Sequence, residues 1–186
     1  GVGGSGGTTT LAGAGSGSGN TVTNTVEAVV RNSTVNAGGP LSFTATDETT
    51  ISAVAGAVNV TVGVSSGDNV GVGLGLSITV NTIENTARAL LDNSSVTLTS
   101  GGLTMVADSN SDIDSLAFGV GLSVTAGSGT NVSINAIGAA ASNSVTNTIE
   151  AAITGDTETV SAAGAVSLAA SDDSGLQAAG VAATVT

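Results

Sequence analysis

The feature that most constrains the fold of this chain is a tandem repeat of 61 to 62 residues. The segment NTVEAVVRNSTV at 24–35 returns as NTARALLDNSSV at 85–96 and, less closely, as NTIEAAITGDTETV at 147–160. Flanking segments align in the same phase. Self-similarity at a fixed period of this kind is typical of repeat architectures, in which each unit stacks on its neighbours. The three repeats cover approximately 1–61, 62–123 and 124–186.

The two ends of the chain fall at the same phase of this repeat. Thr186 aligns with Ser123, and Gly1 aligns with Val62. We therefore expect a single continuous segment over 1–186, which is either a window from a longer array or a unit that stacks head to tail. No run of about twenty apolar residues is free of polar interruption, so we expect no membrane span.

The apolar content predicts an unusual core. Hydrophobic residues make up 40% of the chain, but aromatic residues make up only 1%, with Phe43 and Phe118 as the two rings. Compact domains draw much of their buried area from aromatic side chains. The remaining apolar residues are Ala, Val, Ile and Leu, which suit a narrow interior. A chain this hydrophobic and only 9% charged is also unlike a disordered segment.

The periodicity predicts strands rather than helices. LSFTATD at 41–47 and NVTVGV at 59–64 alternate with period two and are rich in β-branched residues. The segment ENTARALLDN at 84–93 alone resembles a helix, but its counterparts in the other repeats carry β-branched residues. Turn signals such as GG, SGDN and SDDSG recur every eight to twelve residues. We therefore expect an all-β fold with essentially no helix.

Two β architectures fit these observations, namely a row of small sandwich domains and a solenoid. A sandwich domain needs about 100 residues and a bulky centre, whereas the repeat is shorter and lacks large side chains. A solenoid needs only a thin, stacked interior. We expect about three coils of roughly twenty residues in each repeat, which would advance about 14 Å along the axis; two longer coils per repeat are the alternative.

The repeat unit resembles a known family. The segment NTVTNTVEAVV at 20–30, with the STV, AGG and ATD motifs that follow it, resembles the repeats of giant bacterial surface proteins. These include filamentous haemagglutinin-like and leukotoxin-like adhesins and autotransporter passenger stalks. The resemblance covers nearly the whole chain. It implies a right-handed parallel β-helix at the surface of a Gram-negative-type cell, and it carries over no catalytic residue.

Charge and composition restrict the classes of partner that the chain is expected to bind. The net charge is −12, and Arg31 and Arg88 are the only cations. Nucleic-acid binding requires a basic surface, and an anionic membrane surface also attracts basic segments, so neither is expected as a partner. We expect the chain to associate with itself, head to tail or laterally, or within a longer chain, and to meet host or neighbouring cells.

Six asparagines recur in phase with the repeat. They are Asn20, Asn81 and Asn143 in one slot, and Asn24, Asn85 and Asn147 in another. We interpret them as structural ladders that satisfy backbone groups at turns or inside the fold. In a third slot Glu27 and Glu150 flank Arg88. A catalytic glutamate would not alternate with arginine, so we expect outward side chains there.

Acidic residues cluster at one phase of the repeat, in segments that the pattern places at turns. These are Asp47-Glu48, Asp108/Asp112/Asp114 and Asp172-Asp173. The segment DSNSDID at 108–114 is the best candidate for Ca²⁺, because calcium takes several oxygen ligands. It lacks the glycine and the distal glutamate of an EF-hand loop. We therefore name Asp108, Asp112 and Asp114 as candidate metal ligands and otherwise expect no cofactor.

The sequence favours a structural role over an enzymatic one. The chain has no His, Cys, Lys, Tyr or Trp, so it lacks the basic residues and the aromatic platforms of carbohydrate-cleaving clefts. A site of paired carboxylates is the remaining enzymatic alternative, and the unequal acidic positions of the repeats argue against it. We expect a non-catalytic β-solenoid that forms the stalk or shaft of an extracellular bacterial adhesin or filament. The alternative is a Ca²⁺-stabilised module, or one that binds carbohydrate or ice. An ice-binding surface would need regular rows of threonine, but the repeats do not preserve them, because Val106 and Asp108 replace Thr44 and Thr46 in the second repeat.

Overall fold

The computed structural model describes residues 6–156 and 159–186, and in this part of the chain all regular structure is β-strand. The strands form three parallel sheets of three, β1-β4-β7, β2-β5-β8 and β3-β6-β9. The fold is thus a parallel β-solenoid, which confirms the all-β prediction. The strands are β1 Thr8–Arg31, β2 Thr34–Ala37, β3 Leu41–Val64, β4 Asn69–Asp92, β5 Ser95–Leu98, β6 Leu103–Ala126, β7 Asn131–Thr154, β8 Val160–Ala162 and β9 Val166–Val185.

Each repeat forms one coil, so the expectation of three short coils per repeat is wrong. Asn24 pairs with Asn85, and Asn85 pairs with Asn147, in neighbouring strands of one sheet. A coil consists of a 24-residue strand, a strand of three or four residues and a second long strand. Segments that resembled turns, such as SDDSG at 171–175, lie inside long strands. Stacking on a similar sequence satisfies their backbone groups, so Gly and Ser do not interrupt the strand.

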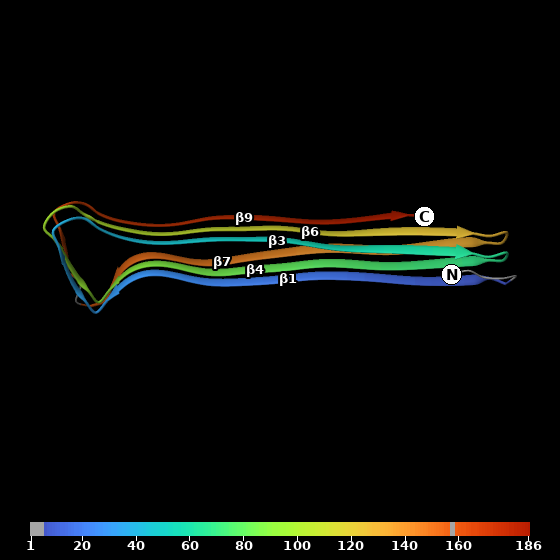
Figure 1. The fold of residues 1–186 in the computed structure, drawn as a ribbon, viewed down its shortest axis with the longest axis horizontal. Helices are drawn as coiled ribbons and strands as arrows, with labels where there is room; N and C mark the ends of the chain where they lie inside the picture. The colour runs from blue at the N-terminus through green and yellow to red at the C-terminus, as the bar shows by residue number, and fades with distance from the viewer. Residues whose placement is uncertain (1–5, 157–158) are drawn as a thin grey trace.

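The molecule is therefore a flat blade and not a thin rod. Strands of 24 residues extend about 80 Å, while stacked coils advance only about 4.8 Å each. Figure 1 shows β1, β4 and β7 running beside β3, β6 and β9 along the long axis. The short strands β2, β5 and β8 close one end, which we call the broad end. Turns at 65–68 and 127–130 close the other, which we call the tight end.

The half of the blade next to the broad end has a conventional core. Inward side chains there include Leu91, Leu103 and Met105, all fully buried, and a smaller cluster around Ile83 and Ile113. The outward positions on the same strands are mostly polar, as the exposed Thr, Asn and Asp positions of β6 show. This half follows the alternation that a half-buried strand requires.

The half next to the tight end has the opposite pattern. Most of its inward residues are polar, glycine or alanine, and Thr61, Asn69 and Thr79 are fully buried. Many of its outward residues are large and aliphatic, such as Val60, which is 54% exposed, and Leu74, which is 51% exposed. On β3 the change occurs between Ser52 and Val54, without any break in the strand. The broad half therefore has its large apolar residues inside, whereas the tight half has most of its large apolar residues outside.

Glycines in neighbouring strands make room for the few bulky residues of this thin fold. The inward Ile137 lies where a Cβ on Gly75, Gly119 or Gly121 would come within 2.9 Å of its side chain. The ring of Phe118 lies over Gly56 of the neighbouring coil, where an added Cβ would approach to 2.2 Å. Large side chains in one coil are therefore matched by missing side chains in the next.

The first corner of each coil repeats a left-handed backbone position. Asn32 and Asn93 have φ values of 47° and 46°, and Gly155 has 123° at the corresponding corner of the third coil. Asn and Gly are the residues that adopt this conformation most readily. The side chains also stack, since Asn93 Nδ2 donates to Asn32 Oδ1 at 2.7 Å.

One coil per repeat makes a testable prediction. A chain that carries a second copy of residues 62–123 should gain one coil and a higher midpoint of thermal unfolding, because stacked repeats stabilise one another. Its maximum dimension in small-angle X-ray scattering should equal that of the parent chain, since the long axis follows the strands. An increase of about 14 Å would instead support three short coils per repeat.

Candidate functional site

The first asparagine column forms a ladder along the solenoid axis. Asn20 Nδ2 donates to Asn81 Oδ1 at 2.8 Å, and Asn81 Nδ2 donates to Asn143 Oδ1 at 3.0 Å. Asn143 Nδ2 then donates to the carbonyl oxygen of Gln177 at 2.6 Å. Asn81, in the middle coil, is 1% exposed. The ladder satisfies amide groups that would be costly to bury without partners.

The second asparagine column reaches across the interior to the facing sheet. Asn24 Nδ2 donates to Asp47 Oδ1 at 3.1 Å and to Thr49 Oγ1 at 3.0 Å. Asn85 Nδ2 donates to Asp47 Oδ2, and to Thr49 Oγ1 at 2.9 Å. Asp47 is only 4% exposed. A buried carboxylate is tolerated when hydrogen-bond donors converge on it, and two stacked asparagines supply them here.

The facing column alternates between carboxylate and hydroxyl. Asp47, Ser109 and Asp172 occupy one slot in successive coils. Asn147 Nδ2 donates to Asp172 Oδ1 at 3.1 Å and to Ser109 Oγ at 3.2 Å. Three aspartates in this slot would place like charges about 4.8 Å apart inside the fold. The serine in the middle coil keeps the two carboxylates apart.

Outward charges form a ladder of their own. Arg88 lies between Glu27, at 3.7 Å, and Glu150, at 3.4 Å. Three short coils per repeat would have placed these slots out of contact, but with one coil per repeat they are neighbours. The other cation, Arg31, donates to Asp92 at 3.2 Å. Both arginines of the chain therefore bridge adjacent coils, where opposite charges favour the observed register.

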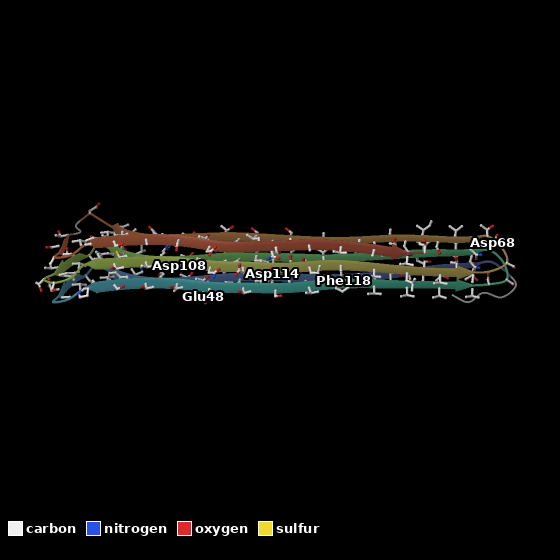
Figure 2. The ribbon with its side chains drawn as sticks, turned by 90° about the horizontal axis from the view of Figure 1, so that it is seen from above. Glu48, Asp68, Asp108, Asp114 and Phe118 are labelled. Atoms are coloured by element: carbon white, nitrogen blue, oxygen red, sulfur yellow. The ribbon has the colours of Figure 1, made fainter. Side chains whose placement is uncertain are left out.

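The acidic segments lie within strands, not at turns as the sequence suggested. Because side chains alternate, Asp47 and Asp172 point inward, whereas Glu48 and Asp173 occupy outward positions in the paired slots. Figure 2 shows Glu48, Asp108 and Asp114 along the blade and Asp68 at its tight end. The outward acidic residues thus form an acidic face on the broad half of β3, β6 and β9.

The candidate calcium ligands are spread along this face. Asp108, Asp112 and Asp114 lie at outward positions of β6, which alternate with inward ones along the strand. Ser171 Oγ donates to Asp108 Oδ1. In residues 6–156 and 159–186, no group of three or more His, Cys, Asp or Glu residues is placed to hold a metal ion. On the adjacent coils each of these aspartates has only uncharged partners: Thr46 and Ser171 for Asp108, Thr50 and Gly175 for Asp112, and Ser52 and Gln177 for Asp114. A cation here would therefore find isolated carboxylates rather than a cage.

Sequence reasoning missed two features of the site. The first is the buried Asp47, which the charge pattern placed on the surface. The second is the exposed aliphatic surface of the tight half. The sequence contains a pattern that could have predicted this surface, because the even-numbered positions of β3 are polar up to Ser52 and apolar from Val54 onward. A change of phase of this kind indicates that the polar and apolar sides of a strand exchange.

Comparison with protein-family models, with curated proteins and with solved structures found no match. Among the residues that the structure describes, no helix is both long and apolar enough to cross a membrane. The arrangement of the side chains is therefore the basis for any functional conclusion. It shows buried amide and carboxylate columns, paired outward charges and an exposed apolar surface.

The buried asparagine column should contribute strongly to stability. Replacing Asn85 with alanine leaves Asp47 in the interior without its nearest amide donor, so we expect Asn85→Ala to lower the free energy of unfolding by about 3 kcal/mol. Urea denaturation would measure this. Asn110→Ala, at an exposed position of β6, is the matched control and should change stability by less than about 0.5 kcal/mol. Equal effects would contradict a structural role for the column.

The outward charge ladder should be sensitive to salt. Arg88→Glu places three carboxylates side by side, so we expect a loss of about 1 kcal/mol at low ionic strength. Added salt should reduce the loss, since exposed charges are screened. Thr82→Glu, whose neighbours are Thr21 and Ser144, adds a carboxylate without charged partners in the adjacent coils and should cost less. Urea denaturation at two salt concentrations checks both variants.

Proposed function

We propose that this chain is a structural, non-catalytic segment of an extracellular bacterial adhesin or filament, in which coils stack along one axis to form a shaft. The observation that carries the proposal is the register. All 24 residues of β4 pair in order with β1 on one side and β7 on the other. A further coil with this repeat would find the same polar, apolar and charged slots at either end.

The two ends of the stack support this proposal. The strands β1, β2 and β3 form one edge of the three sheets, and β7, β8 and β9 form the other. Edge strands present backbone groups that pair readily with another strand. Here the edges are long and are matched in register, so either the next repeat of a longer chain or a second copy of this chain fits them.

The shape determines which mechanical property the segment supplies. One coil uses 61 to 62 residues for a single step of about 4.8 Å, so the shaft gains length slowly. In return, each step adds two long strands and one short strand of backbone hydrogen bonds. We infer a broad, stiff shaft that resists bending and proteolysis, because local opening must break many bonds together.

The extracellular location rests on sequence. The repeats resemble those of bacterial surface adhesins, and an acidic chain without cysteine or lysine is compatible with that setting. The exposed polar positions of the broad half, including Glu48 and Asp114, are the surface that would meet solvent and neighbouring cells. No residue of the blade is assigned a catalytic role in this proposal.

The hydrogen-bond pattern shows which backbone groups face the open edge. Asn69 N donates to the carbonyl oxygen of Thr130 at 2.8 Å, and Asn93 N donates to that of Thr154 at 2.7 Å. Even-numbered residues of β7 therefore bond to β4, and odd-numbered ones point to the edge. On β9 the parity is reversed, since Leu103 N donates to the carbonyl oxygen of Ala165.

Proline substitutions at adjacent positions can separate stacking from folding. Ala141→Pro with Ala170→Pro removes amides that face the open edge. The β-sheet circular dichroism should therefore remain, while axial stacking of one chain on the edge strands of another is lost. Ala140→Pro with Ala169→Pro removes amides that bond within the solenoid and should destabilise the fold. Electron microscopy at rising protein concentration measures assembly. Unchanged assembly of the edge variant would contradict axial stacking.

A further inference from the structure

The outward surface of the tight half on β3, β6 and β9 is a continuous apolar face. We define the apolar face as the outward positions of residues 54–64, 116–126 and 179–185. Its large aliphatic residues are between 38% and 62% exposed, the extremes including Leu122 and Val54. The inward positions behind it are polar or small. The large aliphatic side chains of these strand segments therefore lie on the outside, where no other part of the fold covers them. An apolar surface of this kind marks an interaction site.

The apolar face is large enough for a specific interface. It has six outward positions on each of β3 and β6 and four on β9. With strands about 4.8 Å apart and outward residues about 6.6 Å apart, each position covers about 32 Å². The face therefore covers about 500 Å², and two such faces in contact bury about 1,000 Å², the size at which specific interfaces begin.

The charges of the same sheet restrict how a partner can lie. The apolar face contains no charged residue, whereas the broad half of the same outward surface carries five carboxylates and no cation. A second copy laid parallel on this sheet would place the two acidic surfaces opposite each other. A copy turned end for end would overlap only the apolar halves and point the acidic halves away from each other. The carboxylates are Glu48, Asp108, Asp112, Asp114 and Asp173.

We propose that the apolar face binds the apolar face of a second copy of this chain, with the two blades antiparallel and related by a twofold axis. The two β3-β6-β9 sheets pack face to face at about 10 Å, as stacked sheets do. The overlap is about 36 Å along the strands and the pair is about 120 Å long, compared with about 80 Å for one blade. This lateral contact is independent of the axial stacking proposed above.

A second copy fits the apolar face better than a lipid bilayer does. Insertion of this half into lipid would expose the edges of β1 and β7 to the hydrocarbon, where unpaired backbone groups are very costly. Contact between two copies leaves those edges in water or in contact with further coils. It also removes aliphatic surface from solvent without moving any charge out of water.

The test compares two pairs of lysine substitutions in this 186-residue chain. Val60→Lys with Leu122→Lys places two charges on adjacent coils of the apolar face, because Val60 pairs with Leu122. Ser42→Lys with Thr104→Lys places two charges on the same pair of strands in the broad half, where both positions are exposed. Circular dichroism establishes that each variant is folded. Val60→Thr with Val120→Thr is a milder pair that keeps β-branched side chains.

We expect sedimentation to show a dimer for the unmodified chain and for the broad-half variant. The apolar-face lysine variant should weaken the dimer by about a hundredfold, since like charges are brought together in an apolar contact. The threonine pair should weaken it less. X-ray scattering should give a maximum dimension of about 120 Å for the dimer. Axial stacking would leave that dimension at about 80 Å, so the two modes of association are distinguishable.

Three results would overturn the proposal. The first is a monomer of the unmodified chain at concentrations far above those of the assay. The second is a dimer that both lysine variants retain equally. The third is flotation of the chain as a monomer with uncharged phosphatidylcholine vesicles, lost in Val60→Lys with Leu122→Lys alone, which would assign the apolar face to a lipid surface.

Discussion

The rest of the structure depends on the pairing of each coil with a nearly identical coil. Parallel in-register pairing satisfies the backbone of the central strands on both sides and that of the edge strands on one side, whatever the side chains are, so glycine- and serine-rich segments persist as strands. Pairing also places like residue on like residue at about 4.8 Å. Amide ladders benefit from this arrangement, as Asn81 shows, whereas carboxylates do not. The chain therefore repeats its asparagines closely and varies its charges, with Ser109 between two aspartates and Arg88 between two glutamates.

A thin interior follows from the same constraint. Two long sheets face each other, and side chains of one sheet reach those of the other, which is why Asn24 and Asn85 both bind Asp47. The two aromatic rings are placed differently, because Phe43 packs against the core near the broad end, whereas Phe118 lies outward over a glycine. The interior is held by aliphatic residues near the broad end and by polar columns elsewhere, of which the asparagine ladders are hydrogen-bonded whereas side chains such as Ser77 and Thr79 have no hydrogen-bond partner. This combination favours one register, because a slip of one residue would bury charges and expose the aliphatic core.

The exchange of polar and apolar sides along a single strand gives the blade two different surfaces. The broad half is acidic and hydrated outside, as expected for a surface exposed to solvent. The tight half is aliphatic outside, with uncharged polar groups inside. A long array of such coils would carry both surfaces along its whole length. An axial shaft and lateral contacts between blades then arise from different atoms, backbone edges in the first case and outward aliphatic side chains in the second.

Periodicity and β-propensity were sufficient to predict the repeat, an all-β fold without helix, the β-solenoid class and the phase of the asparagine columns. The number of coils, the blade shape and the inward position of Asp47 depend on how the repeats pair in the folded chain, which the sequence pattern does not specify. The alternation of inward and outward residues is the same in a coil of twenty residues as in one of sixty, so it does not give the coil length. A segment rich in Gly and Ser is predicted to be a turn unless its pairing with a neighbouring strand is known. The parity of each position also depends on where a strand begins, so the sequence alone could not assign Asp47 or Val60 to the inside or the outside.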